Sequence, residues 1–341
     1  MCETEIKLSG EQQNFIKTAM KGNFHKIQFI KNINYQEVSP PFIRTCLRRL
    51  VGLINFKQKN LITDFDLTNL IDADTNQKEN MWPSKKKCAF ISTHDIDTAF
   101  GQDYIENYFE IEKELNIRST NFWVTHLYKL NHGLLQQAVS NAFEIGLHDY
   151  NHDGKLVMLN QEEIKNRISL SQNFIKEYSV EGIRSPGFLR SMNFYSAIKD
   201  LFNYDMSIVD YSFLFPYPGD GCRTSQPLLF ENLILLPSSL IRDGEALALG
   251  LKPKEILNTW IMKYNWLKSK NGLIVLLTHP DKGFSGRKDM LEIYKTFLEY
   301  VKNDHDCWIS TAKELTKYLK QNKRPLIQTI QISNSGEDTV E

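Results

Sequence analysis

From Cys88 onward, short apolar runs alternate with longer helical patterns, and this rhythm constrains the fold more than any other feature of the chain. Alternation of this kind is typical of βαβ units, whose strands form a parallel sheet. About seven such units predict closure into a barrel rather than an open sheet. The predicted strands lie near Cys88–Thr93, Asn121–Val124, Glu144–Leu147, Gly182–Arg184, Asp205–Val209, Leu273–Leu277 and Cys307–Ser310. The predicted helices cover roughly Gln102–Asn116, Gly133–Phe143, Gln161–Tyr178, Asn193–Phe202, Pro253–Ser269, Lys288–Lys302 and Thr311–Lys320.

Three segments fall outside this rhythm. Residues 1–80 combine helical pieces with a polar loop and predict an N-terminal, mainly helical extension. The segment Tyr211–Ser239 is rich in Pro and Gly and predicts a long loop or an inserted hairpin. Residues 324–341 are polar and predict a flexible tail. The barrel is then expected to cover residues 81–323 as one domain.

Composition limits the partners that the chain can have. The 41 Lys and Arg residues balance 41 Asp and Glu residues, so a strongly basic surface for nucleic acid is not expected. No apolar run approaches the roughly 20 residues that span a bilayer, and the first residues lack the apolar core of a signal peptide. We therefore expect a cytoplasmic protein without an integral membrane segment, of undetermined oligomeric state. The 5 scattered cysteines contain no CxxC pair, so neither a disulfide framework nor a cysteine zinc site is expected.

Four polar clusters follow predicted strands, at the edge where parallel barrels place their active sites. In the first cluster, Asp95 and Asp97 would point to the same side of an extended backbone. Its alternative interpretation is an Asp-rich turn that caps the next helix. In the second cluster, the four-residue spacing of His148 and His152 puts two imidazoles on one face of a helical turn, where they suit one metal ion. Its alternative is a chance occurrence of the HxxxH pattern.

The third and fourth clusters each contribute one basic side chain. Arg184 stands before Ser-Pro-Gly and could hold a catalytic carboxylate ionised and oriented, or form a surface salt bridge. His279 ends the longest apolar strand. It could donate a proton, since the pKa of an imidazole is about 6.5, or be structural. The joint placement of the four clusters is the main indication of a functional site.

Taken in order, these motifs resemble those of the polysaccharide deacetylase family, also called the NodB-homology or carbohydrate esterase family 4 enzymes. The order is an Asp pair, HxxxH, Arg-x-Pro and a late Leu-x-x-His strand end, over about residues 82–319. The resemblance implies a distorted (β/α)7 barrel with one divalent metal ion, usually zinc. The usual first motif of the family is Thr-Phe-Asp-Asp, and the sequence Thr93–Asp97 instead resembles a branch with an HDVD-like motif.

The resemblance also assigns roles to individual residues. The implied metal ligands are Asp97, His148 and His152. The implied catalytic residues are Asp95 as the base, Arg184 as its brace and His279 as the general acid. The departure in the first motif leaves open whether Asp95 and Asp97 exchange roles.

The family has a further motif, an Asp that pairs with the late His. Asp205 and Asp210 are its candidates, and Asp210 follows a predicted strand more clearly. Further residues are expected to contact substrate, namely Trp82, Tyr150, Pro186, Asp210 and Tyr211.

The predicted function is that of a metal-dependent hydrolase acting on C–N bonds other than peptide bonds. It would remove an acetyl group from an N-acetylated sugar or glycoconjugate precursor, using metal-activated water, an Asp base and a His acid. One alternative keeps the site for a formyl group or another non-peptide amide. The other is an inactive barrel that binds carbohydrate, which the complete set of catalytic and ligand residues disfavours.

Overall fold

The computed structural model of the chain describes residues 9–22, 81–214, 219–324 and 326–329. Most of the predicted N-terminal extension and of the predicted tail lie outside the described residues. The described part of the extension is helix α1 (Gly10–Lys21), whose Ile16 and Met20 are buried in the main hydrophobic core. The described part of the tail contains strand β10 (Ile327–Gln328), which pairs with the sheet.

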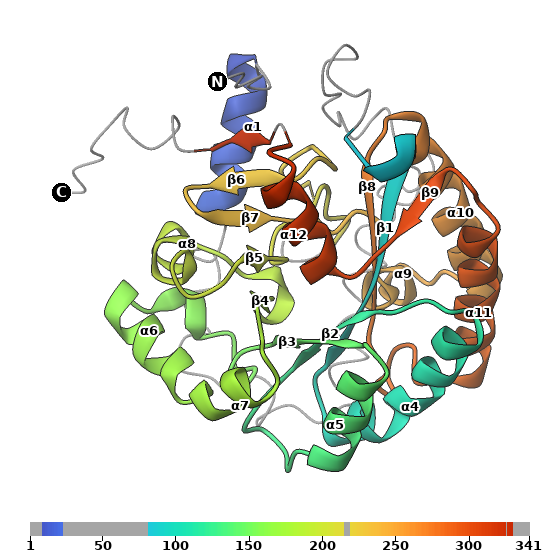
Figure 1. Ribbon diagram of the computed structural model, residues 1–341, viewed down its shortest axis with the longest axis horizontal. Coiled ribbons are helices and arrows are strands. Elements are labelled where there is room, and N and C mark those ends of the chain that lie inside the picture. The colour runs from blue at the N-terminus through green and yellow to red at the C-terminus, as the bar shows by residue number, and fades with distance from the viewer. Residues whose placement is uncertain (1–8, 23–80, 215–218, 325, 330–341) are drawn as a thin grey trace.

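The strands form one curved, 10-stranded sheet. The other strands are β1 (Cys88–Ile96), β2 (Thr120–Trp123), β3 (Glu144–Leu147), β4 (Gly182–Ile183), β5 (Tyr204–Asp205), β6 (Leu228–Phe230), β7 (Leu233–Leu235), β8 (Leu273–Thr278) and β9 (Cys307–Ile309). The parallel order β7–β5–β4–β3–β2–β1–β8 curls like the wall of a barrel (Figure 1). This confirms the predicted class, an α/β fold of the distorted barrel type.

Helices connect these strands, and most of them lie outside the curved sheet, whereas α9 and α12 lie within its outline (Figure 1). They are α4 (Ala99–Glu114), α5 (His132–Ser140), α6 (Gln161–Ser169), α7 (Gln172–Glu177), α8 (Met192–Ile198), α9 (Asp243–Ala248), α10 (Pro253–Ser269), α11 (Lys288–Lys302) and α12 (Ala312–Gln321). None of the helices in the described ranges is long and apolar enough to cross a bilayer. Helix α12 begins against the amino ends of β2 and β3, where the Ala312 N–H donates to Thr120 Oγ1 and the Lys313 N–H to Glu144 Oε2. The amino end of the sheet is therefore covered, and the carboxyl ends of the strands are left for a site.

Strand β1 directs alternate side chains to opposite faces of the sheet, as an extended backbone requires. Phe90 and His94 contact aromatic rings of α11 on the outer side. Asp95 points to the inner side, where it meets Arg184 from the end of β4. The polar inner residue lies at the carboxyl end of the strand, as the sequence predicted.

The segment predicted as a loop or inserted hairpin does contain a hairpin. Strands β6 and β7 are antiparallel, with Leu228 opposite Leu235, and Glu231 in the turn has a φ of 52°. Beyond the prediction, β7 also joins the parallel ladder beside β5. Strand β9, predicted as an equal member of the barrel, pairs with the first residues of β1 alone. The apolar triplets of β6 and β7 are too short to be distinguished from loop by pattern.

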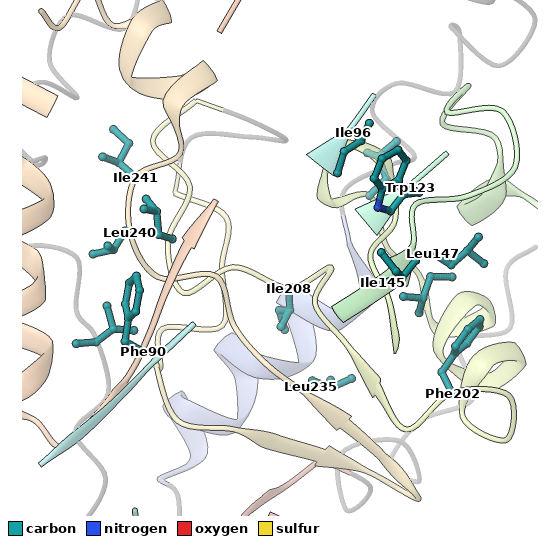
Figure 2. Close-up of a cluster of buried hydrophobic side chains, with 14 of the residues drawn as sticks. Phe90, Ile96, Trp123, Ile145, Leu147, Phe202, Ile208, Leu235, Leu240 and Ile241 are labelled. Carbon is teal, nitrogen blue, oxygen red and sulfur yellow. The ribbon is translucent and has the colours of Figure 1, made fainter. Parts of the chain in front are cut away.

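An irregular segment after β7 connects the two sides of the curved sheet. The Ser238 N–H donates to the Ile208 carbonyl at 2.9 Å, and the Leu240 N–H donates to the Val275 carbonyl of β8 at 3.0 Å. Leu240 is buried in the main hydrophobic cluster, of which Figure 2 shows Phe90, Ile96, Trp123, Ile145, Leu147, Phe202, Ile208, Leu235, Leu240 and Ile241. With this segment fixed, the residues that follow it, including Asp243, lie near the carboxyl end of β8.

Candidate metal and catalytic site

Three potential metal ligands meet at the carboxyl ends of β1 and β3. Their ligand atoms, from Asp97, His148 and His152, all lie within 4.8 Å of one another. Asp97 Oδ1 is 3.3 Å from His148 Nε2 and 3.2 Å from His152 Nε2. The structure thus brings together the three residues that the sequence resemblance named as ligands.

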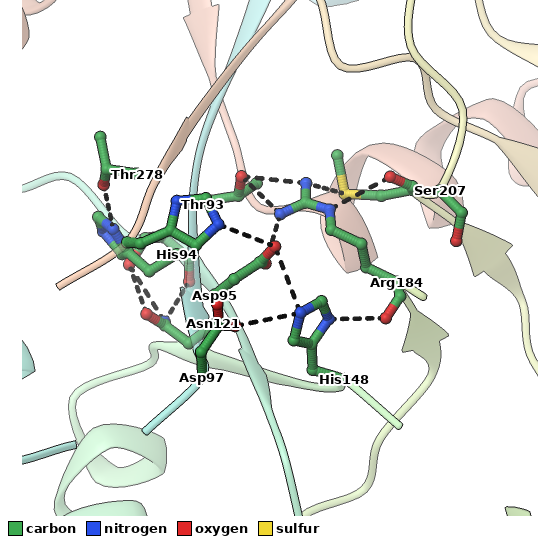
Figure 3. Close-up of polar contacts among 12 residues, drawn as sticks. Thr93, His94, Asp95, Asp97, Asn121, His148, Arg184, Ser207 and Thr278 are labelled. Carbon is green, nitrogen blue, oxygen red and sulfur yellow. Dashed lines mark hydrogen bonds and ion pairs between the residues drawn. The ribbon is translucent and has the colours of Figure 1, made fainter. Parts of the chain in front are cut away.

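The hydrogen bond on the far side of the His148 ring fixes its tautomer. His148 Nδ1 lies 2.8 Å from the Arg184 carbonyl oxygen (Figure 3). Because a carbonyl can only accept, Nδ1 must carry the proton and donate it. The lone pair of a neutral ring is then on Nε2, which faces Asp97. A second partner of this kind is typical of histidines that bind metal.

The residues present fit a divalent metal ion. Asp97 Oδ1 is buried and has no hydrogen-bond partner among the described residues, a state that costs about 1–3 kcal/mol when nothing compensates it. Burial opposes ionisation of Asp97, but the neighbouring charge of His152 holds its pKa well below the usual range. Two imidazoles and one ionised carboxylate, with room for water, are a common donor set for catalytic zinc.

Asp95 is held beside this cluster by a buried ion pair. Arg184 Nη1 donates to Asp95 Oδ1 at 2.8 Å, while Asp95 Oδ2 lies 3.6 Å from His148 Nε2 and 3.9 Å from His279 Nε2. Burial raises the pKa of Asp95, but Arg184 and then His148 and His279 lower it more. Asp95 is therefore an ionised carboxylate with one oxygen fixed and the other facing the histidines.

Arg184 is itself fully buried and held on several sides. Its Nη1 and Nη2 each lie 3.0 Å from Thr93 Oγ1, and its Nε donates to the Met206 carbonyl at 3.2 Å (Figure 3). The guanidinium carbon lies 4.4 Å from the centre of the Phe122 ring. The surface salt bridge considered for Arg184 is therefore wrong, and its orientation is set from three directions.

His279, after β8, pairs with a residue that the sequence analysis missed. His279 Nδ1 lies 2.7 Å from Asp243 Oδ1, and the His279 N–H donates to Asp243 Oδ2 at 2.7 Å. Burial lowers the pKa of His279, but the charge and hydrogen bond of Asp243 raise it to about 9. His279 is thus protonated at neutral pH.

Neither Asp205 nor Asp210 pairs with His279, which corrects the expectation for that motif. Asp205 accepts hydrogen bonds from the side chain and backbone of Ser207, and Asp210 forms a buried ion pair with Lys263 at 2.8 Å. Asp243 stands two residues after the apolar pair Leu240-Ile241, and this strand-like run before a carboxylate was the available signal.

Known proteins share this fold and part of this sequence. The polysaccharide deacetylase family model matches residues 83–200. This stretch of the chain is therefore similar to the polysaccharide deacetylases. The resemblance inferred from the motifs is thereby confirmed over a region that contains Asp95, Asp97, His148, His152 and Arg184, whereas Asp243 and His279 lie beyond it. No curated protein sequence matches the chain.

Solved structures show where the deacetylase fold recurs. A Mycobacterium smegmatis structure assigned to the polysaccharide deacetylases superposes with a TM-score of 0.61 at 18% identity, over 76% of this chain and 97% of its own. Puue allantoinase has a TM-score of 0.59 at 13% identity, over 70% and 92%. A Pseudomonas aeruginosa PAO1 structure, also assigned to the polysaccharide deacetylases, has a TM-score of 0.58 at 11% identity, over 70% and 93%. At these identities the likeness establishes the fold alone.

Two of the predicted substrate residues lie next to the deacetylase motifs. Tyr150 stands between the two histidines, and its half-buried ring stacks on His126 with centroids 4.4 Å apart. Pro186 is buried and starts a short helical turn, Pro186–Phe188. The Phe188 ring lies 5.6 Å from the Arg184 guanidinium. Both predicted residues therefore border the cluster, and their contact with substrate stays a prediction.

The other predicted substrate residues have structural partners. Trp82 is buried, and its Nε1 donates to the carbonyl of Asn271, just before β8 begins. It therefore lies at the amino end of the sheet, opposite His279, and the expectation of a substrate contact is wrong. Asp210 is occupied by Lys263, and the buried Tyr211 ring lies 4.4 Å from the Arg223 guanidinium. The structure does not bring these three residues to the group formed by Asp97, His148 and His152.

Proposed function

We propose that the chain is a metal-dependent hydrolase that removes the acetyl group from an N-acetylated sugar or glycoconjugate precursor. One observation carries the proposal. Asp95 Oδ2 stands between the ligand His148 and the protonated His279, 3.6 and 3.9 Å from their Nε2 atoms. A base, an acid and a metal site therefore face one small volume, which is the arrangement that amide hydrolysis needs.

The metal site would be formed by Asp97, His148 and His152, with zinc as the first candidate. A bound divalent ion lowers the pKa of a bound water from 15.7 to about 7 and polarises the acyl oxygen. The chain prepares this site in advance, because the Arg184 carbonyl orients His148 and both imidazoles face Asp97 Oδ1.

Asp95 would take the proton of the attacking water. Arg184 keeps the carboxylate ionised and holds Oδ1, so that Oδ2 is the oxygen available to accept the proton. Positioned general bases contribute about 10²–10⁴-fold to the rate. The burial of the pair excludes water from the Oδ1 side and keeps the geometry fixed.

His279 would protonate the leaving amine. Its Nδ1 proton is held by Asp243, so Nε2 is the atom that can give a proton to substrate. A pKa of about 9 keeps the ring charged at neutral pH, as a general acid requires. An amine is a poor leaving group without this proton.

The family model is the basis for a sugar substrate. Its description names polysaccharide deacetylases, and the matched residues include the base and all three proposed ligands. One protein with a similar fold is named an allantoinase, which keeps a non-sugar amide as the second candidate for the same site.

The test measures metal content and product release from the full chain. We expect about one zinc ion per chain on elemental analysis, and acetate release from a panel of free, nucleotide-linked and lipid-linked N-acetyl sugars. Matched N-formyl sugars and allantoin distinguish the second candidate. Asp95→Asn is the control for a contaminating hydrolase. A zinc-loaded protein that binds these sugars but releases no acid or amine would contradict the proposal and favour the inactive barrel.

A further inference from the structure

One arginine of α6 holds both ends of the loop that carries the two histidine ligands. Arg167 Nε donates to Asp149 Oδ1 at 2.8 Å, and Arg167 Nη2 donates to Asp149 Oδ2 at 2.8 Å. Arg167 Nη2 also donates to Asp153 Oδ1 at 2.7 Å, and Arg167 Nη1 donates to Asp153 Oδ2 at 3.2 Å. Every nitrogen of the guanidinium is therefore used, and both carboxylates are held at two points.

The position of these carboxylates in the chain gives the contact its meaning. Asp149 directly follows His148, and Asp153 directly follows His152. The guanidinium thus joins the two backbone positions next to the two imidazole ligands. The side chains of Asp149, Asp153 and Arg167 are 1%, 8% and 14% exposed, so these charged hydrogen bonds are little screened by water.

The loop between the histidines contains two residues with unfavourable, left-handed backbone angles. Asp149 has a φ of 66° and His152 a φ of 53°. Left-handed backbone costs a residue with a side chain about 1–2 kcal/mol. Such residues persist where the surroundings over-determine them. The bonds of Arg167 to Asp149 and Asp153 constrain the loop on both sides of His152, in addition to the backbone hydrogen bond from the His126 N–H to the Tyr150 carbonyl.

We infer that Arg167 is a positioning residue, which sets the separation and direction of the two imidazole ligands before the metal binds. This inference rests on the metal site of the proposed function. Arg167 itself is assigned no contact with metal or substrate. Removal of groups that orient metal ligands typically weakens metal binding by about 10–100-fold.

A purely electrostatic role makes the opposite prediction. A guanidinium near a cation site repels the cation, so its loss would leave Asp149 and Asp153 uncompensated and tighten metal binding. Arg167→Lys separates the two roles, because lysine keeps the charge but cannot hold two carboxylates in the planar, two-point manner of arginine. Positioning predicts weaker binding in this variant, whereas electrostatics alone predicts no change.

The experiment titrates the metal-free full chain with Zn²⁺ and Co²⁺ against a chromophoric chelator, at a temperature where circular dichroism shows each variant to be folded. We expect Arg167→Lys to raise the dissociation constant about 10–100-fold and to alter the Co²⁺ absorption spectrum. The matched control is Arg287→Lys, which changes an exposed Arg–Asp pair at the start of α11 and should leave the constant unchanged.

A folded Arg167→Lys that binds metal as tightly as the unchanged chain would overturn the inference. If Arg167→Lys does not fold, Asp153→Asn takes its place, because it weakens one half of the contact and keeps the Asp149 half. We expect a smaller but measurable loss of affinity, and an unchanged constant overturns the inference. These outcomes leave the proposed function intact, whereas an unchanged chain that binds no metal contradicts both.

Discussion

Asp243 holds His279 at two points, with Oδ1 2.7 Å from the ring Nδ1 and Oδ2 2.7 Å from the backbone nitrogen. In the first contact the ring donates its Nδ1 proton to Asp243. In the second the backbone N–H donates to the same carboxylate, so ring and backbone share one partner. His279 Nε2 is thereby aimed toward Asp95 Oδ2, 3.9 Å away. Ser285 Oγ also donates to Asp243 Oδ2 at 2.6 Å, so the carboxylate that orients the His279 ring is itself oriented.

The first prediction concerns Asp243→Asn and the pH dependence of activity. In the proposed mechanism His279 donates a proton, so activity should fall as the pH rises through its pKa of about 9. Burial lowers this pKa and Asp243 is the largest influence that raises it, so the loss of that carboxylate leaves only the weaker effects of Asp97 and Asp95 against burial. We expect the alkaline limb of the kcat profile to move to lower pH by more than one unit.

Ser285→Ala is the matched control for this shift. It removes one hydrogen bond to Asp243 Oδ2 but keeps the negative charge beside His279. We expect its alkaline limb to move much less than that of Asp243→Asn. An alkaline limb that is the same in Asp243→Asn and the unchanged chain would show that His279 is not the titrating acid.

The second prediction distinguishes the roles of two carboxylates. Asp95 lies in β1, and Asp97 directly follows the strand. Asp95→Asn should retain metal, because Asp95 is paired with Arg184, but should lose about 10²–10⁴-fold in kcat with the base removed. Asp97→Asn should lose metal, because Asp97 Oδ1 faces both imidazoles. Elemental analysis and acetate release on the same samples decide the case. If Asp97→Asn retains metal and Asp95→Asn does not, the two roles are exchanged.

The third prediction concerns the stability of the buried pair. Arg184→Met would leave Asp95 ionised and unpaired in the interior, which costs about 3–5 kcal/mol of unfolding free energy at neutral pH. In the unchanged chain the depressed pKa of Asp95 stabilises the fold above the pKa of the unfolded state, and this contribution is lost as the pH falls through the folded pKa. In the variant the penalty should shrink as the pH falls, because protonation removes the unpaired charge.

Urea unfolding at several pH values measures this effect. Arg184→Met combined with Asp95→Asn is the control, because it removes both charges. We expect the double variant to recover part of the stability at neutral pH and to lose the pH dependence. If the two substitutions lower the unfolding free energy additively, so that Asp95→Asn costs as much in Arg184→Met as in the unchanged chain, the two residues do not act as a pair.

The parts of the site that the sequence predicted are those built from neighbours in the chain. Asp95 and Asp97 lie two residues apart at a strand end, and His148 and His152 lie four apart in one loop, so a local pattern is enough to bring each pair together. Arg184 needed one further step, the rule that carboxyl ends of parallel strands meet at one edge. The apolar run Leu273–Leu277 predicted strand β8, and hence the position of His279, in the same way.

The parts that were missed depend on contacts far apart in the chain. Asp243 reaches His279 because Leu240 hydrogen-bonds to Val275 of β8, and no spacing in the sequence encodes that register. Strand β7 joins the ladder beside β5 for a similar reason, since its three residues gain their partners from distant segments. Trp82 is a different case, because it precedes β1 and chain direction alone places it near the amino end of that strand, away from the edge where the site forms.

The fourth prediction concerns the docking of α1 on the barrel. Gly22, after α1, has a φ of 68° and a ψ of 174°, a backbone conformation essentially limited to glycine. A Cβ at this position would lie 2.1 Å from the Arg190 carbonyl oxygen, while Arg190 Nε donates to the Ala19 carbonyl of the helix. Gly22→Ala should therefore displace α1 and lower the unfolding free energy by about 1–3 kcal/mol or more.

Gly10→Ala is the matched control, because it makes the same substitution at the other end of α1. A Cβ on Gly10 would meet no atom within 4 Å, so we expect no loss of stability. Thermal unfolding and limited proteolysis, read by mass spectrometry for cuts within α1, measure the difference. Faster cleavage in Gly22→Ala alone would follow from exposure of the buried face that contains Ile16 and Met20. Equal cleavage and equal stability of the two variants would show that α1 does not depend on its close contact with Arg190.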